Sequence, residues 1–375
     1  MVRSSLLCLA LFFLALGVSF GQQSAEETAI EALRRHYFVS GKPVSFVYIA
    51  ETRSINTEAL KYLKDLPSLQ SVQIIGPSNL ADVDLVHFAT LRKLANLNLD
   101  YNENIGDPGM VHLKGLTQLR SLSLWDTDVG DAGFEKLKNL TNLEELTLRG
   151  TRITDLGLKH LQKFKKLRIL DLARTKVTAA GLKNIENLVN LEALYLNETE
   201  IADEGMKHLT KMQKLRVLWG SNVFGDQGLK TLSGLKGLRK LELADSKVTD
   251  RGMVHLASMN GVAWLGLMGT EISGIGLKNL LNKKQLTKLR HLNLDKTKVL
   301  DDDLKYLKEC PRLHVLGLMH TKITDKGLVH LLKLPNLTEV WLFGTEITGE
   351  GLLKLQSQMP KVKIHPSPPR VGAPF

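Results

Sequence analysis

Six histidines recur at the same place in a repeating sequence pattern, five of them directly before a leucine and His87 before a phenylalanine. They are His87, His112, His160, His208, His255 and His330. Imidazoles that converge in pairs or triples are the usual ligands of zinc, so a column of them raises the question of a metal site. Most of these histidines are separated by a unit that lacks one, which places them roughly 10 Å apart in a stack of strand-spaced units. We therefore predict a half-exposed position that tolerates polar rings, and no metal site.

Other residues with chemical potential are also explained by the repeating pattern. Cys310 takes a position where other units have leucine or phenylalanine, which predicts a small buried hydrophobe instead of a nucleophile. The acidic run "LDDDL" (300–304) lacks the spacing of a calcium-binding loop. The sequence shows no Ser/His/Asp constellation, phosphate-binding loop or paired carboxylates outside the pattern. We predict no catalytic residue, no cofactor and no enzyme activity.

The aromatic residues give a stronger functional signal, because they gather on one face of the expected strands. All four tryptophans of the chain fall there, and an exposed tryptophan on a sheet is costly unless it packs or binds. The predicted partner-binding residues are Trp125, Tyr195, Trp219, Trp264, Met268, His291, Met319, His320, Trp341 and Phe343. The alternative is that these side chains only pack on one another and stiffen the sheet.

The last four units concentrate these side chains into one expected patch. Its members are Trp264, Met268, His291, Met319, Trp341 and Phe343. Strands about 4.8 Å apart give this patch a width of roughly 15 Å, which suits a helix or loop of a partner. Gly266 and Gly317 would leave a shallow depression between the aromatic side chains. The first half of the same face is polar and includes Asp100 and Asp171; it could bind a carbohydrate or a charged peptide, or be an ordinary solvated surface.

The elements that position these residues come from an internal repeat. The stretch "TRITDLGLKHL" (151–161) has near-copies at 199–209, 246–256 and 321–331. Taking residues 143–166 as the frame, thirteen units of about 24 residues begin at Val44, Leu69, Leu94, Leu119, Leu143, Leu167, Leu191, Leu215, Leu238, Val262, Leu289, Leu313 and Leu337. Residues 361–365 are the stub of another unit. A fixed period of this length is typical of a solenoid.

Each unit combines two hydrophobic periods. Leucines at positions 4 and 6 alternate as in a strand, whereas positions 16, 19 and 22 are spaced as in a helix. One strand and a two-turn helix cannot close a core alone, so stacked units must share one. Thr at position 9, for example Thr151, is expected to bridge the backbones of successive units. Asp or Thr before the helix is expected to cap its N–H groups, and the Gly at position 15 to avoid crowding the next unit.

The full pattern, L-x-x-L-x-L-x-x-T-x-I-T-D-x-G-L-x-x-L, resembles the leucine-rich repeat. It is most similar to the ribonuclease-inhibitor-like subclass with TDxGL helices, found in F-box partner proteins and in exported bacterial proteins. Threonine replaces the asparagine or cysteine common at position 9, and no F-box-like helical bundle precedes the repeats. The resemblance implies an α/β fold: a right-handed solenoid shaped as a horseshoe, with a parallel sheet on the concave side, short helices outside, and partners held on the concave sheet.

The two ends of the chain differ from the repeats. Residues 1–21 have the layout of a secretory signal peptide, with a basic start, a short apolar run and small residues before the expected cleavage site. The apolar run is shorter than the roughly 20 residues that span a bilayer; an uncleaved anchor is the alternative. Residues 22–43 are predicted to form a helical cap, with Ser24 and Glu27 as a capping box. We assign 44–365 to the leucine-rich repeat domain and 366–375 to a flexible Pro-rich tail.

The net charge of the chain bears on the kind of partner that we expect. The chain carries a formal net charge of +11, with its Lys and Arg residues scattered among Asp and Glu, so it is biased only weakly toward anionic partners. We predict an exported, non-enzymatic scaffold, in the periplasm, on the cell surface or outside the cell, that binds a protein or peptide on its concave face. The alternatives are a binder of an anionic envelope or surface polymer, or a structural spacer. Neither a nucleic-acid partner nor a transmembrane segment in the mature chain is expected.

Overall fold

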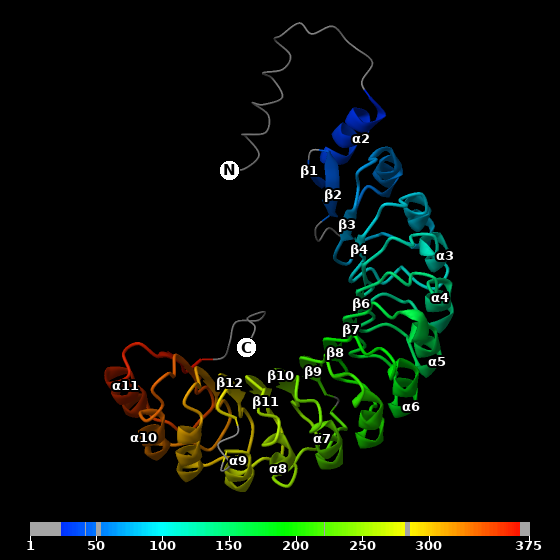
Figure 1. Ribbon diagram of the computed structural model, residues 1–375. Helices are drawn as coiled ribbons and strands as arrows, with labels where there is room; N and C mark the ends of the chain where they lie inside the picture. Colours follow the sequence, from blue (N-terminus) through cyan, green and yellow to red (C-terminus); the bar gives the residue numbers. More distant parts are fainter. Residues whose placement is uncertain (1–23, 42, 50–53, 221, 282–285, 368–375) are drawn as a thin grey trace, which may run out of the picture.

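Successive units stack side by side into an open arc, with a sheet along the inner side and helices along the outer side (Figure 1). The computed structural model describes residues 24–41, 43–49, 54–220, 222–281 and 286–367. The expected signal peptide and nearly all of the expected tail lie outside these residues. The assigned domain boundaries therefore stay predictions.

The inner side of the arc is one sheet whose strands follow the order of the sequence. Its fifteen described strands are β1 (Phe38–Gly41), β2 (Val44–Ile49), β3 (Ser71–Ile74), β4 (Asn96–Asn98), β5 (Ser121–Ser123), β6 (Glu145–Thr147), β7 (Ile169–Asp171), β8 (Ala193–Tyr195), β9 (Val217–Trp219), β10 (Lys240–Glu242), β11 (Trp264–Gly266), β12 (His291–Asn293), β13 (Val315–Gly317), β14 (Glu339–Trp341) and β15 (Lys363–His365). β1 pairs antiparallel with β2, and every later pair is parallel. The predicted α/β solenoid with a parallel concave sheet is confirmed.

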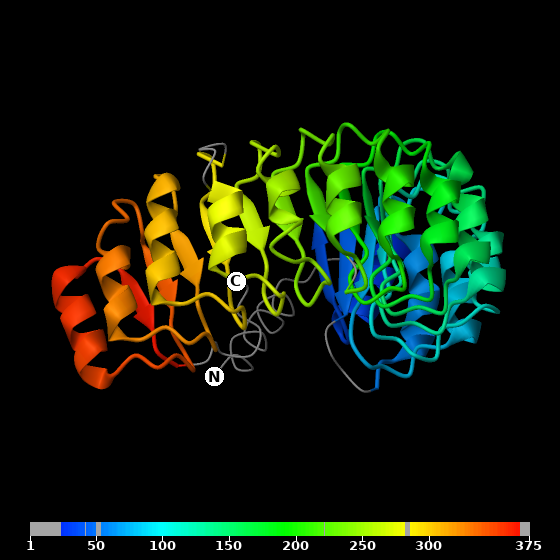
Figure 2. The same cartoon turned by 90° about the horizontal axis from the view of Figure 1, so that it is seen from below.

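Short helices cover the outer side, as Figure 2 shows from a second direction. The α-helices are α2 (Ala25–Arg34), α3 (Met110–Leu113), α4 (Asp131–Lys136), α5 (Asp155–Leu158), α6 (Ala179–Leu182), α7 (Asp226–Leu232), α8 (Met253–Leu256), α9 (Gly274–Leu281), α10 (Leu328–Leu331) and α11 (Gly349–Gln358). The 3₁₀ helices are η1 (Thr57–Asp65), η2 (Asp82–Phe88), η3 (Lys159–Lys163), η4 (Lys183–Ile185), η5 (Asp203–Leu209), η6 (Asp301–Glu309) and η7 (Asp325–Gly327). The predicted capping box holds the start of α2, where Ser24 and Glu27 exchange hydrogen bonds. The strand β1 was not predicted.

The core between sheet and helices is a stack of leucine columns. In the unit that begins at Leu143, the leucines at positions 1, 4, 6, 16 and 19 are all fully buried. Parallel pairing in register places Leu122, Leu146 and Leu170 next to one another, so each column continues from unit to unit. Burying one leucine side chain contributes about 1.5–3 kcal/mol, and the columns join into one continuous core.

A second set of contacts ties each unit to the next through an aspartate. The carboxylate of Asp131 accepts hydrogen bonds from the next unit: from the backbone N–H of Thr154 at 2.9 Å, from its hydroxyl at 2.6 Å and from the N–H of Gly157 at 2.9 Å. Asp155, Asp226, Asp250, Asp301 and Asp325 bind the Thr or Ser of the following unit in the same way. Thr154 caps its own helix, as predicted. The aspartate instead caps the start of the following unit.

In the described residues, the recurring threonine at position 9 donates its hydroxyl hydrogen bond within its own unit, which corrects our expectation. The hydroxyl of Thr151 donates to the carbonyl oxygen of Leu148 in its own unit at 2.5 Å, and the same bond recurs at Thr127, Thr175, Thr199, Thr270, Thr297, Thr321 and Thr345. The hydroxyl is short, and the carbonyl three residues earlier is the acceptor within its reach. The longer side chain of Asn102 does reach the preceding unit, where it donates to the carbonyl of Ile74 at 2.9 Å.

The glycine at position 15 should be essential to this ladder of aspartates. A Cβ atom on Gly181 would overlap Oδ1 of Asp155, so Gly181→Ala must displace the carboxylate from Thr178. We expect a loss of roughly 1–3 kcal/mol in the free energy of unfolding, measured by urea denaturation. The matched control is Gly234→Ala, because nothing lies within 4 Å of the added Cβ; its change should stay within about 0.5 kcal/mol. Equal stability of the two variants would contradict the proposed packing.

Candidate binding hollow on the concave face

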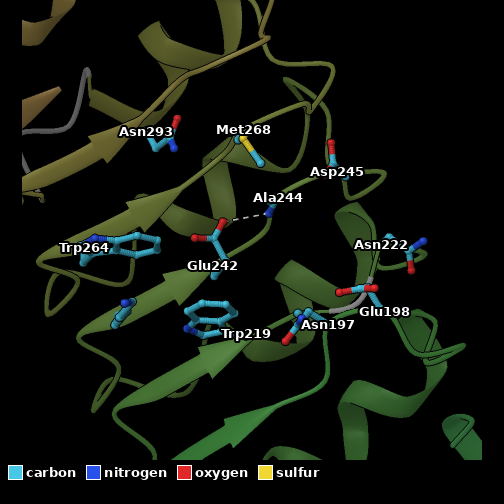
Figure 3. A pocket seen from close by; sticks show the side chains of 12 residues that line it. Asn197, Glu198, Trp219, Asn222, Glu242, Ala244, Asp245, Trp264, Met268 and Asn293 are labelled. Carbon is cyan, nitrogen blue, oxygen red and sulfur yellow. Dashed lines mark hydrogen bonds between the residues drawn. The ribbon is translucent and has the colours of Figure 1, made fainter. Parts of the chain in front are cut away.

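A hollow of about 540 Å³ opens on the concave face, centred on strands β9 to β11 (Figure 3). Trp219, Glu242 and Trp264 come from the strands themselves, and residues after the strands close its other side. The full lining is Asn197, Glu198, Trp219, Gly220, Asn222, Lys240, Glu242, Ala244, Asp245, Trp264, Met268 and Asn293. The hollow lies beside the turn after β9, in a unit that is one residue shorter than the usual 24.

Two indole rings form opposite walls of the hollow. Trp219 lies on β9 and Trp264 on β11, so that β10 runs between them. The ammonium group of Lys240, on β10, lies 5.3 Å from the centroid of the Trp219 ring and 4.2 Å from that of Trp264. Such cation–π contacts contribute roughly 0.5–2 kcal/mol each, depending on desolvation. Tyr195 supports Trp219 from the other side, with an edge contact at 5.6 Å between ring centroids.

A half-buried carboxylate, that of Glu242, forms the floor between these walls. One oxygen of Glu242 accepts a hydrogen bond from the N–H of Ala244 at 3.0 Å (Figure 3). Burial raises the pKa of Glu242 to about 7, and the Ala244 N–H and the charge of Lys240 only partly oppose this. The carboxylate occupies the space that a Cβ on Gly266 would need. A group that changes charge near neutral pH therefore lies between the two indoles.

The role of the strand glycines differs from our expectation. Gly266 and Gly317 were expected to leave a shallow depression between aromatic side chains. Instead, an acidic side chain of the preceding unit enters that space. Glu242 lies over Gly266, and Asp295 lies over Gly317, where a Cβ atom would be 2.7 Å from its carboxylate oxygen. A missing side chain on one strand gives a neighbouring acidic side chain room to fold onto the sheet.

Several acidic residues of the concave face serve the backbone in this way. The carboxylate of Asp171 accepts from the N–H of Ala173 at 2.9 Å, and that of Asp295 from the N–H of Met319 at 2.6 Å. Burial raises the pKa of Asp171, and it raises that of Asp295 to about 6. These carboxylates are acceptors for peptide N–H groups that point toward the inner side of the arc.

The polar side chains in the first half of the concave face likewise bind one another and the backbone. Asp100 is buried and accepts hydrogen bonds from the hydroxyl of Ser123, the N–H of Trp125 and the amide of Asn98. Trp125 packs against the guanidinium of Arg149, 5.3 Å from its ring centroid, and against Tyr101 at 4.6 Å. Trp125 thus lies away from the hollow, within a set of neighbouring side chains.

The expected patch at the last four units is partly covered by the chain itself. Trp341 and Met319 are only 8% and 7% exposed, although both were expected to face a partner. The stub of the last unit forms β15 and pairs with β14, so that His365 stacks on Trp341 with 3.8 Å between ring centroids. His365 also lies 2.9 Å from Glu339. The final strand therefore covers the tryptophan that sequence reasoning left open.

The remaining predicted residues divide between the hollow and its surroundings. Trp219, Trp264 and Met268 line the hollow. His291 neighbours Trp264 across the β11–β12 pair, and burial lowers its pKa. His320 and Phe343 form an edge contact at 5.1 Å. Sequence reasoning missed Lys240 and Glu242, although a signal was present: both alternate on a strand whose two neighbours each carry a tryptophan.

Metal and thiol chemistry find no support in the described residues. No group of three or more His, Cys, Asp or Glu side chains within them is placed to hold a metal ion. In the histidine column, His208 pairs with Glu186 at 3.2 Å. Cys310 is 1% exposed, and burial raises the pKa of its thiol to about 12, which confirms a buried hydrophobe.

Comparison with known proteins agrees with this geometry. The family described as leucine-rich repeat region matches residues 68–364. The chain belongs to the leucine-rich repeat family. Assignment to the ribonuclease-inhibitor-like subclass stays a prediction. Members of this family are typically binding scaffolds without enzyme activity, and they commonly bind proteins. No curated protein sequence gives a significant match.

Solved structures of bacterial leucine-rich repeat proteins are similar to the chain. An internalin from Listeria monocytogenes matches with a TM-score of 0.64 and 23% identity, over 87% of each chain. A leucine-rich repeat protein from Leptospira interrogans matches with a TM-score of 0.54 and 18% identity, over 81% of this chain and 91% of the other. At these identities the likeness shows the fold alone. Every helix in the described part of the chain is too short or too polar to span a bilayer.

The raised pKa of Glu242 should make stability depend on pH. The folded value of about 7 exceeds the ordinary 4.5, so the folded chain binds this proton more tightly and loses stability as pH rises from 4.5 to 7. Glu242→Gln removes that loss. We expect its melting temperature, relative to wild type, to rise between about pH 5 and about pH 8. Glu145→Gln, at an exposed position of β6 on the same face, is the control and should show no such trend. A difference that does not vary with pH would contradict the titration of Glu242.

Proposed function

We propose that this protein is an exported, non-enzymatic scaffold that holds a protein or peptide partner in the concave hollow between Trp219 and Trp264. The observation that carries the proposal is the hollow itself: about 540 Å³, with indole walls and a few polar groups on its floor. Pockets that combine apolar walls with a small number of polar groups are typical of binding sites. Tryptophans at the centre of an interface frequently dominate its binding energy.

The proposed site lies where the structure has a hollow, and not where the sequence concentrates its aromatic residues. The hollow is centred on β9 to β11 instead of on the last four units, where β15 covers Trp341. Its location near the middle of the concave sheet lets a partner contact strands on both sides. The layout of residues 1–21 supports export, and the family supports a protein partner.

Binding should depend on the two indole walls. We expect the double variant Trp219→Ala/Trp264→Ala to lose at least about 30-fold in affinity for peptides that wild type selects from a random display library, since hot-spot residues contribute about 2 kcal/mol or more. Affinity is measured by isothermal titration calorimetry, and folding by near-ultraviolet circular dichroism. Trp125→Ala is the matched control, because Trp125 lies on the same face outside the hollow. Full affinity in the double variant would refute the proposed site.

A second candidate, a binder of anionic polymer, is favoured by one edge of the arc. In the first half of this edge, directly before the strands, Arg168 approaches both Glu144 and Glu192. In the later units the residue directly before the strand is Arg216, Arg239 or Arg290 in three of the units, and all three arginines are exposed. Arginines repeated at the spacing of strands form a basic ridge that attracts a long polyanion.

This candidate has a distinct signature in salt. Retention on immobilised dextran sulfate should fall steeply between about 0.1 M and about 1 M ionic strength, where the screening length shrinks from ~10 Å to ~3 Å. The triple variant Arg216→Ala/Arg239→Ala/Arg290→Ala should elute at lower salt. Lys159→Ala/Lys207→Ala/Lys230→Ala, which removes the same charge from exposed positions on the outer helices, should elute as wild type does. Equal shifts in both triple variants would point to net charge and against a ridge.

A further inference from the structure

We infer that the hollow recognises a cationic side chain, arginine or lysine, of a peptide partner, inserted between Trp219 and Trp264 and directed at the carboxylate of Glu242. The inference rests on the proposed function, because it names the chemistry of the partner for the same site. It is drawn from the contacts of Lys240, the acidic residues that line the hollow, and the carboxylate of its floor.

The chain itself shows that the slot between the indoles holds a cation. β9 and β11 are two strand spacings apart, roughly 10 Å, which leaves room for one layer of atoms above β10. The ammonium of Lys240 lies in this slot, 4.2 Å from the centroid of one ring and 5.3 Å from the other. An arginine or lysine from a partner would make the same contacts with the ring faces. Lys240 thus acts as an internal stand-in for the ligand.

The charge around the slot is acidic, in contrast to the chain as a whole. Glu198, Glu242 and Asp245 line the hollow, and Lys240 is the one basic residue among its described lining. Glu198 and Asp245 follow their strands at residues with left-handed backbone, φ 57° and 54°. Both side chains are exposed. Glu198 forms ion pairs with Arg149 and Arg174 at 3.8 and 4.0 Å, and its side chain is still 62% exposed, so a partner can reach this carboxylate. Local charge therefore complements a basic side chain in a protein of net charge +11.

The floor favours a cation for a further reason. The one oxygen of Glu242 that faces Ala244 is held by that N–H, and Figure 3 shows the carboxyl group between the two tryptophans. A buried carboxylate loses hydration and regains stability when a guanidinium or ammonium pairs with it. The charged groups that act on Glu242 are Lys240 on its own strand and Asp245 after it. Glu198, after β8, also lines the hollow, and His291 on β12 lies beside Trp264. β9 and β11 contribute uncharged Trp219 and Gly266. Cation binding should therefore release a proton near neutral pH, and affinity should rise from about pH 6 to about pH 8.

Because Lys240 itself lies in the slot, its substitution should raise the affinity for a cationic ligand instead of lowering it. A ligand cation must displace the ammonium of Lys240 from the slot or bind against its repulsion. Lys240→Met keeps the length and apolar character of the side chain but removes the competing charge, so it should strengthen binding of a cation. If the ligand were anionic, Lys240 would be its anchor, and the same substitution would weaken binding.

The experiment uses the mature chain and two capped peptides, acetyl-Gly-Gly-Arg-Gly-Gly-amide and its isosteric citrulline analogue. Binding is followed by NMR at the methyl group of Met268, which lines the hollow, and peptides are titrated into the millimolar range. We expect binding of the arginine peptide, about 10-fold tighter in Lys240→Met and about 10-fold weaker in Glu242→Gln. Glu145→Gln, which has the same change of charge on an exposed position, should bind as wild type does. No response to the arginine peptide, or an equal response to the citrulline peptide, would overturn the inference.

A peptide-display selection separates this inference from the proposed function. Selected peptides rich in Arg or Lys, whose binding requires Trp219 and Trp264, support both. Peptides that require both tryptophans but lack basic residues overturn the inference and leave the proposed function standing. Acidic peptides whose binding is lost in Lys240→Met likewise overturn the inference. A selection that yields no peptide dependent on the two tryptophans overturns both.

Discussion

The rest of this structure depends on one interaction, in which an aspartate side chain of one unit accepts hydrogen bonds from backbone N–H groups of the next unit. Every short helix begins with N–H groups that have no partner within the helix. Asp131 supplies the missing acceptor for the unit that follows, and the glycine of that unit leaves the carboxylate enough room. The leucine columns provide most of the apolar burial, but they tolerate sliding. The directional bonds of the aspartates fix how far each unit advances, and hence which strand residues become neighbours on the inner side.

On the concave face, other acidic side chains likewise accept hydrogen bonds from peptide N–H groups. Glu242 and Asp295 bind peptide N–H groups and lie over the glycines of the adjacent strands. Asp295 is buried and Glu242 half-buried, because side chains from neighbouring units crowd the inner side of the arc. At most of these places the acidic group is enclosed by its own surroundings. Around Glu242 the neighbours are two indole rings and a shortened turn, so a structural acceptor faces a hollow. A feature that supports the backbone elsewhere thereby becomes available for recognition.

Sequence alone predicted the fold in detail because several independent patterns in the repeat indicate the same structure. The alternation of leucines, the helix spacing and the fixed period all indicate the same solenoid, and the buried columns confirm it. The site was predicted only in part. The positions of Trp219 and Trp264 within their units were enough to deduce that their side chains face the inner side of the arc. Whether a ring is exposed depends on contacts between units, which the period does not encode: His365 covers Trp341, and Asp295 fills the space above Gly317. Lys240 and Glu242 were overlooked because charged residues on a strand resemble an ordinary solvated face.

The pairing of Asp155 with Gly181 has a consequence for the length of such a chain. The carboxylate recognises only the start of the adjoining unit, and most units offer the same start. A change that removed or added whole units would therefore leave compatible junctions on either side. The arc could change length outside β9 to β11 without altering the residues that line the hollow.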